Sequence, residues 1–375
     1  MTEAFRRPSW HEAAIWMGMS FPGFVRLMRG RTRQIDPAYL VDAVIDAGFA
    51  GGNSAATLVS RLLFEREHFR RRADRPPFQT NPVFILGHWR TGTTLLHELM
   101  SLDPALRFSN AYECFLPHHF PLTQRWIKPW SAFALPSKRP PDNMQVGWDL
   151  PQEDEFALVN LGLPSPYLTI AFPNQGLAHS DYFELEKIPA ADLEHWKLVF
   201  SDFLRRLVAY RPGRLVLKSP PHSFRIPTLQ SLFPEACFIY LIRNPREVYA
   251  STVHLWRSLF HTHGYQKPDE SWIPEFVLDT FARLCRRVEA TRGVVAEGRF
   301  LVVRYEEFVA DPLSTLRMIY DRFAIGDFES IEPTIAANLA SRKNYQKNRF
   351  QLGGEEQAAI AERWGEFFKL FGYAM

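Results

Sequence analysis

A short stretch of the chain combines glycines, hydroxyl side chains and a cation in the spacing of an anion-binding loop. Residues 83–86 form an apolar run, rich in branched side chains, with the length of a buried parallel strand. Gly87 and Gly92 then enclose His-Trp-Arg-Thr, and apolar residues recur at helical spacing up to Met100. The first N–H groups of a helix have no backbone partner, and its dipole favours negative charge. We therefore expect this loop to hold a phosphate.

The loop lacks the lysine of an ATP-binding P-loop. Its glycine spacing satisfies the first half of the pattern GxxxxGK[ST], but Thr93 occupies the position of the lysine. Its cation is Arg90, inside the loop. Thr91, Thr93 and Thr94 add hydroxyl donors that suit a phosphosulfate and need no metal. A kinase that uses ATP or GTP remains the first alternative.

Further strands are predicted to end in polar or cationic side chains. Apolar runs at residues 214–217, 236–242 and 300–303 lead directly into Lys218, Arg243 and the pair Arg304 and Tyr305. Asn244 and Pro245 then supply an N-cap and a first-turn proline for a helix that carries Ser251. In open parallel α/β sheets, ligands bind outside the carboxyl ends of the strands. We expect these groups and Arg90 to converge on one anion-binding crevice.

Two of these motifs resemble those of sulfotransferases that use 3′-phosphoadenosine 5′-phosphosulfate (PAPS). Arg-Thr-Gly-Thr-Thr-Leu-Leu after a strand resembles their 5′-phosphosulfate loop, especially in the tyrosylprotein-sulfotransferase-like branch and its bacterial relatives. LFPEACFIYLIRNPREVYAS resembles the second signature, in which an arginine that ends a strand precedes a helical serine by eight residues. Here these residues are Arg243 and Ser251. The motifs follow in order between about residues 82 and 323.

The resemblance implies a role for each strand-end residue, with PAPS as co-substrate and no metal. Arg243 and Ser251 hold the 3′-phosphate, and Tyr305 is similar to the family's adenine-side tyrosine. Arg90 and Lys218 stabilise the charge that grows on the leaving 5′-phosphate, whose oxygens the loop and its threonines hold. After the kinase, the second alternative is a membrane-associated protein that binds nucleotide without turnover.

A base is needed beside the anion site to take the proton of the acceptor. In the branch that the chain resembles, a glutamate after the phosphate helix does this, and Glu113 in SNAYECFLPHH is the best match, slightly later than in the tyrosylprotein enzymes. The alternative is that Glu113 is a loop carboxylate paired with Arg107. His222 is the reserve candidate for the base, ahead of His118 and His119.

Composition is that of a globular protein without a nucleic-acid signature. Among 375 residues, 46% are hydrophobic and 23% charged, and 44 basic against 41 acidic residues leave a net charge of +3. Cys114, Cys237 and Cys285 are odd in number and far apart, so we expect them to be reduced. The N-terminus has no continuous apolar segment of a signal peptide, which predicts a cytoplasmic protein and leaves open a peripheral position at the inner face of a membrane.

Alternating strand and helix patterns predict an α/β fold. We expect a three-layer, P-loop-like domain over residues 78–375, with a central parallel sheet and helices on both faces, and a helical arm over residues 1–77. An insert at about residues 117–178 is dense in proline and tryptophan and is expected to cover the acceptor site. Its prolines exclude a membrane-spanning helix in the uncharged stretch 156–178.

The arm is basic and aromatic at its start. Residues 1–35 favour a packed helical arm with solvated arginines over a peripheral membrane contact. Asp36 and Pro37 predict the start of a helix whose inward face comprises Leu40, Val41, Val44 and Ile45. A second helix is predicted from Ser54 onward, with Leu58, Leu62 and Phe69 along it and arginines at residues 70–72.

The insert also bears on the choice of acceptor. Its aromatic side chains and few cations suit a hydrophobic alcohol, such as a lipid, quinol or polyketide, better than a polyanionic carbohydrate. The acidic residues 153–155 either supply a second carboxylate to the acceptor site or are exposed to solvent. The partner expected from the sequence is therefore a small-molecule or lipid acceptor.

Overall fold

The computed structural model describes residues 15–62, 81–134, 147–342 and 350–375. The chain divides into two compact units of interleaved segments. Unit 1 comprises Met1–Gln79, Ser109–Pro212 and Arg257–Glu270, and unit 2 comprises Thr80–Phe108, Gly213–Trp256 and Ser271–Met375. The predicted boundaries of an arm, a domain and an insert stay a prediction beside this division.

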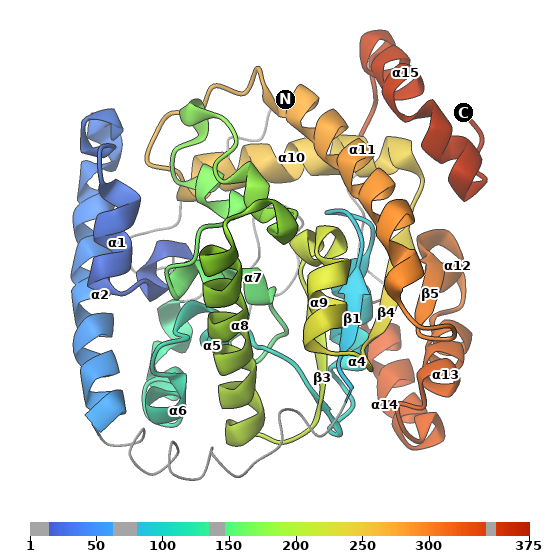
Figure 1. Cartoon of the computed structure of the whole chain (residues 1–375), viewed down its shortest axis with the longest axis horizontal. Helices are drawn as coiled ribbons and strands as arrows, with labels where there is room; N and C mark the ends of the chain where they lie inside the picture. The colour runs from blue at the N-terminus through green and yellow to red at the C-terminus, as the bar shows by residue number, and fades with distance from the viewer. Residues whose placement is uncertain (1–14, 63–80, 135–146, 343–349) are drawn as a thin grey trace. The chain divides into compact units, whose positions relative to one another are not determined.

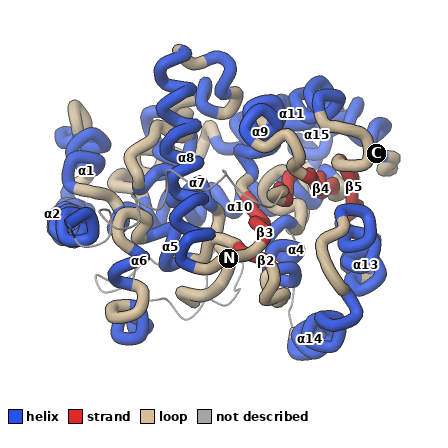
Figure 2. Tube along the Cα trace, turned by 60° about the horizontal axis from the view of Figure 1, so that its bottom comes forward, coloured by secondary structure: helices blue, strands red, loops and turns tan. Residues whose placement is uncertain are grey.

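Unit 2 contains a five-stranded parallel sheet in the order β2-β3-β1-β4-β5. Figure 2 draws its strands in red and labels β2, β3, β4 and β5. The strands are β1 Val83–Leu86, β2 Leu106–Arg107, β3 Arg214–Lys218, β4 Cys237–Ile242 and β5 Phe300–Arg304. β1 is central, and Val83 is in register with Val216 on one side and Cys237 on the other. The four longer strands confirm the predicted ones. β2 has only two residues, too few for a pattern in the sequence.

Helices cover both faces of this sheet, which confirms the three-layer α/β fold. They are α4 Thr93–Met100, α9 Ile226–Leu232, α10 Pro245–His263, which continues into unit 1, α11 Ile273–Thr291, α12 Tyr305–Ala310, α13 Pro312–Phe323, α14 Phe328–Ser341 and α15 Gly354–Phe371 (Figure 1). Val83 and Ile85 share a buried cluster with side chains of α4, α13 and α14. Phe84, on the opposite face, contacts the rings of His222 and Phe233.

Unit 1 is built mainly from helices. Its α-helices are α1 Phe21–Met28, α2 Leu40–Ser60, α5 Ala111–Phe115, α6 Phe120–Thr123, α7 Asp154–Asn160 and α8 Ala190–Tyr210. Its 3₁₀ turns are η1 Ile15–Gly18, η2 Thr32–Gln34, η3 Pro37–Tyr39, η5 Lys128–Ala134, η6 Pro166–Ile170, η7 Pro173–Gln175, η8 Ser180–Tyr182 and η9 Leu185–Lys187. The described parts of the proline-rich insert are thus a series of short helical pieces.

The predicted face of the first long helix is wrong. Leu40, Val41 and Val44 are 49%, 69% and 71% exposed, whereas Asp46 and Asn53 are buried. The buried polar groups have specific partners, which explains the reversal: polar contacts, and not apolar burial, set the rotation of this helix. The Tyr265 hydroxyl donates to Asp46 at 2.5 Å, and the Asn53 amide donates to the backbone carbonyls of Met17 and Met19.

Two further expectations about unit 1 need correction. The predicted helix from Ser54 is not separate, since α2 continues to Ser60, and Phe69 with residues 70–72 lies outside the described residues. Of the two alternatives for the acidic residues 153–155, solvent exposure is wrong for Asp154 and Glu155, because both are buried in the first turn of α7. The helix dipole favours carboxylates there, and Ser165 donates to Glu155 at 2.5 Å.

Other expectations hold. Asn244 accepts a hydrogen bond from the Arg246 amide at the start of α10, as its capping position predicts. The three cysteines are buried and form no disulfide. Across the described residues, none of the helices combines the length and apolar character that a membrane crossing requires.

Candidate active site

The loop between β1 and α4 has a left-handed backbone at two positions. Gly92, the N-cap of α4, has φ 96°, and Arg90 has φ 70°, which is unusual for a residue with a side chain. A β-carbon on Gly92 would lie 2.2 Å from a ring carbon of Tyr305. Glycine is therefore required at this position both by the backbone and by the neighbouring ring.

Side-chain hydroxyls hold this loop in place. Thr91 donates to the His88 carbonyl at 2.7 Å, inside the loop itself. Ser223 accepts from the Gly87 amide at 2.9 Å, and Thr252 donates to the Trp89 carbonyl at 3.3 Å. Ser223 and Thr252 escaped the sequence analysis because a lone hydroxyl residue far from the loop carries no signal of its own. The Thr91 hydroxyl donates its hydrogen within the loop, so the expected contact of Thr91 with the phosphosulfate stays a prediction.

The charge of the loop comes from its arginine and not from its histidine. His88 is buried between Trp89 and Phe281, and burial lowers the pKa of His88 to about 3. Its ring is therefore neutral at physiological pH. Arg90 supplies the positive charge that an anion at this loop requires.

The two sequence motifs meet at this arginine. Arg90 Nε donates to Ser251 Oγ at 2.8 Å, and Arg243 Nη1 donates to the Arg90 carbonyl at 2.9 Å. The Arg243 guanidinium lies 4.5 Å from the centre of the Tyr305 ring, within cation–π distance. The structure thus brings together residues of β4, α10 and α12 with the loop, as expected for strands whose carboxyl ends share one edge.

Lys218 lies at the same edge of the sheet. It is buried at the end of β3, and its Nζ lies 3.4 Å from the hydroxyl of Thr94. Thr93, the residue before Thr94, is buried at the start of α4. His222 is also in unit 2, where it is buried with its ring edge against Phe84 at 5.5 Å.

Glu113 belongs to unit 1 and lies in the first turn of α5. Glu113 is only 1% exposed and forms a capping box with Asn110. The Glu113 carboxylate accepts a hydrogen bond from the backbone amide of Asn110 at 3.0 Å, and the side-chain oxygen of Asn110 accepts one from the backbone amide of Glu113 at 2.9 Å. Its relation to Lys218, and to Arg107 of the alternative pairing, stays a prediction. Burial lowers the pKa of both His118 and His119 to about 4.

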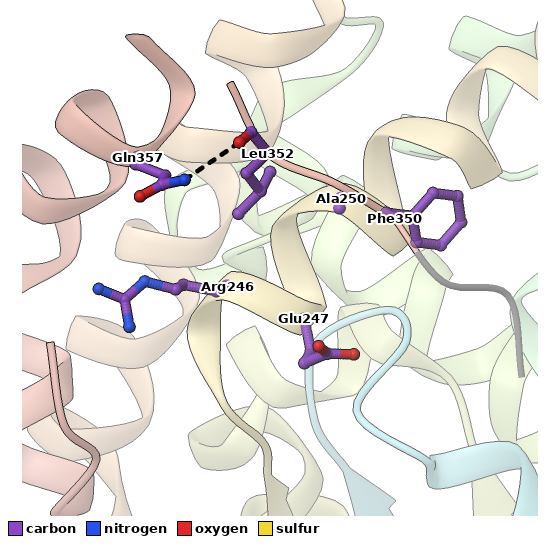
Figure 3. A pocket seen from close by; sticks show the side chains of 6 residues that line it. All are labelled: Arg246, Glu247, Ala250, Phe350, Leu352 and Gln357. Atoms are coloured by element: carbon purple, nitrogen blue, oxygen red, sulfur yellow. Dashed lines mark hydrogen bonds between the residues drawn. The ribbon is translucent and has the colours of Figure 1, made fainter. Parts of the chain in front are cut away.

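A pocket of about 330 Å³ lies on the first turns of α10 in unit 2 (Figure 3). It is lined by Arg246, Glu247, Ala250, Phe350, Leu352 and Gln357. Figure 3 shows Arg246 and Glu247 on one side and the segment of Phe350 and Leu352 on the other, where Gln357 donates to the Leu352 carbonyl at 3.0 Å. The pocket is polar and lies on the helix that carries Ser251.

A parallel sheet whose strand ends carry Arg90, Lys218 and Arg243 around a glycine loop defines a transferase that handles an anionic donor. The family model described as "Sulfotransferase family" matches residues 82–329. The omega-hydroxy-beta-dihydromenaquinone-9 sulfotransferase Stf3 of Mycobacterium bovis is 38% identical over 370 residues, 98% of this chain and 94% of that protein. Its Mycobacterium tuberculosis counterpart gives the same values.

Solved structures agree in fold. Sulfotransferase STF9 from Mycobacterium avium superposes with a TM-score of 0.64 at 20% identity, covering 96% of this chain and 98% of that one. Sulfotransferase STF1 from Mycobacterium tuberculosis has a TM-score of 0.57 at 16% identity, covering 92% and 90%. The chain belongs to the sulfotransferase family and is a sulfotransferase. This assignment favours a sulfotransferase over the two alternatives from the sequence, a kinase that uses ATP or GTP and a membrane-associated protein that binds nucleotide without turnover.

The contact between Gly92 and Tyr305 generates a stability prediction. Gly92→Ala is expected to destabilise the fold by about 2 kcal/mol or more, because alanine must adopt a left-handed φ and displace the ring. Gly354→Ala is the matched control, since nothing lies within 4 Å of its added β-carbon, and it should change stability by less than about 0.5 kcal/mol. Urea unfolding followed by circular dichroism measures both. Equal midpoints for Gly92→Ala and the wild type would contradict the loop geometry.

Proposed function

We propose that the protein transfers the sulfuryl group of PAPS to the hydroxyl of a hydrophobic acceptor and releases adenosine 3′,5′-bisphosphate. The proposal that PAPS is the donor rests on the contact between the two sequence motifs in unit 2. Arg90 donates a hydrogen bond to the Ser251 hydroxyl, and Arg243 donates one to the Arg90 carbonyl. Residues more than a hundred positions apart in the chain form one cationic cluster with donors on three elements. Such a cluster fits a ligand with two separate anionic groups.

The 3′-phosphate is assigned to Arg243 and Ser251. In the structure, Arg90 holds the Ser251 hydroxyl and Arg243 pairs with Glu247 at 3.2 Å. A phosphate would replace the exposed Glu247 carboxylate as the partner of Arg243, because a dianion with three acceptor oxygens makes stronger charge-assisted bonds. Tyr305, stacked under Arg243, is proposed to fix the guanidinium and to border the adenine.

The 5′-phosphosulfate is assigned to the loop. Amides at the start of α4, the hydroxyls of Thr93 and Thr94, and the Gly92 turn surround the N-terminal end of the helix. The acceptor oxygen attacks sulfur, and the bond from sulfur to the bridging phosphate oxygen breaks. Arg90 and Lys218 stabilise the negative charge that collects on the departing phosphate.

The role of the base that removes the proton of the acceptor hydroxyl is assigned to Glu113. A buried carboxylate held by the Asn110 amide is preorganised, since its rotamer is fixed by the capping box. His222 remains the alternative base, whereas His118 and His119 are buried with a lowered pKa.

A hydrophobic acceptor is supported by the named substrate of the relative, a menaquinone-derived lipid. Within the insert, Tyr167 and Phe172 are buried and build the interior of unit 1, whereas Trp126 and Trp130 are 68% and 82% exposed. We therefore assign contact with the acceptor to these two tryptophans. Exposed indole rings bind apolar chains and add few charges.

Peripheral membrane contact through residues 1–35 is part of the proposal. Residues 1–14 lie outside the described residues. In the rest of the segment Trp16 and Phe24 are buried, while Phe21 and Val25 are each 48% exposed. The apolar contact available from this segment therefore consists of the outer side of α1.

The assignment of the 3′-phosphate predicts a selective loss of affinity. Arg243→Ala removes roughly 1.5–3 kcal/mol of charge-assisted contact and should weaken binding of adenosine 3′,5′-bisphosphate ten- to a hundredfold. Adenosine 5′-phosphosulfate, which has no 3′-phosphate, should bind almost unchanged, and isothermal titration calorimetry measures both. Arg299→Ala, which removes an arginine paired with Glu235 at the start of β5, is the control. Equal losses for both nucleotides would mean that Arg243 only supports the loop.

The assignment of the base predicts a loss of turnover without a loss of donor affinity. Glu113→Gln keeps an oxygen for the Asn110 amide but cannot take a proton, so kcat should fall about a hundredfold or more. The rate of sulfate transfer from labelled PAPS and the Kd of adenosine 3′,5′-bisphosphate are measured on the same preparation. If His222→Ala abolishes turnover and Glu113→Gln does not, the two roles are exchanged.

The assignment of the acceptor predicts a preference for apolar alcohols over sugars and peptide tyrosine. Trp130→Ser should raise KM for a long-chain alcohol about tenfold, because an exposed aromatic contact is lost, and should leave the Kd of the nucleotide unchanged. Leu198→Ser, at an exposed position of α8, is the matched control. Efficient sulfation of a soluble carbohydrate, insensitive to Trp130→Ser, would refute this acceptor class.

A further inference from the structure

The outward side of α2 is apolar along its whole length. Phe49, which is 47% exposed, lies on an adjacent side of the helix, seven residues after Asp42. On the outward side the exposed large side chains, each at least 45% exposed, are Leu40, Val41, Val44, Leu58, Val59 and, just past the end of the helix, Leu62. We call these six residues the α2 face. The residues between them on this side are glycine and alanine, so no polar side chain interrupts it. Exposed apolar surface of this extent marks an interaction site.

The rotation of α2 that exposes this face is fixed from inside. Asp46 and Asn53 are buried on the opposite side of the helix and bond to Tyr265, to the carbonyls of Met17 and Met19, and to His119. Turning the face inward would break these bonds and leave buried polar groups without partners. The apolar exposure is therefore a stable property of unit 1.

Cations flank the α2 face at both ends. Arg29 is the C-cap of α1, Arg33 lies in η2 ahead of α2, and Arg61 is the C-cap of α2; all three are exposed, and Asp36 stands between Arg33 and the helix. The charged residues within α2 are Asp42 and Asp46, neither of them on the face. α1 lies against α2 (Figure 1), with the Phe21 amide donating to Ser54 at 2.8 Å, and its exposed Phe21 and Val25 extend the apolar surface.

We propose that the α2 face rests on an anionic lipid bilayer, with α2 lying in the plane of the interface. An apolar side without charges, bounded by arginines, is complementary to acyl chains below a layer of negative headgroups. A second copy of this chain fits less well, because pairing the same face on itself brings like charges together. The inference rests on the proposed lipid acceptor for its purpose, and it adds residues 40–62 to the membrane contact proposed for residues 1–35.

Vesicle sedimentation of the full chain tests this assignment. Wild-type protein should sediment at low salt with vesicles of phosphatidylglycerol and phosphatidylcholine, and much less with phosphatidylcholine alone. Val44→Glu combined with Leu58→Glu should weaken the partition coefficient at least about tenfold, since two charges enter the apolar contact. Leu198→Glu, at an equally exposed position of α8 in the same unit, should bind as the wild type does. Circular dichroism melting confirms that all variants are folded.

The arginines are tested separately. Arg29→Ser and Arg61→Ser should each weaken binding to the anionic vesicles roughly fivefold, and the loss should vanish at high salt, where charges are screened. Arg299→Ser, at the start of β5 in unit 2, is the control. Equal binding of Arg29→Ser, Arg61→Ser and the wild type at low salt would overturn the electrostatic part of the proposal.

Two results would overturn the proposal as a whole. The first is wild-type protein that stays in the supernatant with anionic vesicles. The second is a dimer in sedimentation velocity that Val44→Glu dissociates, without vesicle binding, which would assign the face to a second copy. Binding of adenosine 3′,5′-bisphosphate is measured in parallel: its absence with intact vesicle binding counts against the donor site, and its presence without vesicle binding counts against the α2 face.

Discussion

The close contact between Gly92 and the Tyr305 ring is the constraint on which the donor site depends. It allows the chain to turn from β1 into α4 with left-handed backbone at Arg90 and Gly92, and it presses the end of β5 against the loop. Arg243 also lies over the same ring and donates to the Arg90 carbonyl. One aromatic ring therefore couples the loop to two further strand ends. A cluster of cations in water would repel itself, and here rigid backbone and a shared ring hold it together.

Unit 1 adds buried polar contacts to its apolar interior. Asn53 and Asp46 anchor α2 through hydrogen bonds, and buried carboxylates stabilise the first turn of α7 through donors such as Ser165. Such groups are costly to bury unless every bond is made, so they specify one arrangement more strictly than aliphatic packing does. The helix can consequently present leucine and valine to the outside without losing its orientation.

The sequence allowed the sheet and the donor motifs to be predicted, but not the details that depend on distant partners. Four strands were predicted because parallel strands with both faces covered are nearly continuous apolar runs, as 83–86 and 236–242 are. β2 is too short to have a pattern, and the inverted burial of α2 depends on Tyr265 and His119, which lie far away in the chain. Ser223 and Thr252 support the loop through single hydroxyls, which no spacing reveals. The convergence of Arg90 and Arg243 was expected from the general rule that strand ends share an edge, whereas the place of Ser251 was implied by the resemblance to sulfotransferases.

The register of β1 has a consequence for how the protein is made. β1 leaves the ribosome early, yet both of its neighbours, β3 and β4, come far downstream, and Val83 pairs with Val216 and Cys237. Until β4 emerges, the central strand has no complete hydrogen-bonding environment, and its apolar side chains need shielding. High contact order of this kind slows folding and exposes strand edges to aggregation. Nascent chains are thus expected to need chaperone protection through most of their synthesis, and recombinant yield should depend on translation rate more than on the stability of the finished fold.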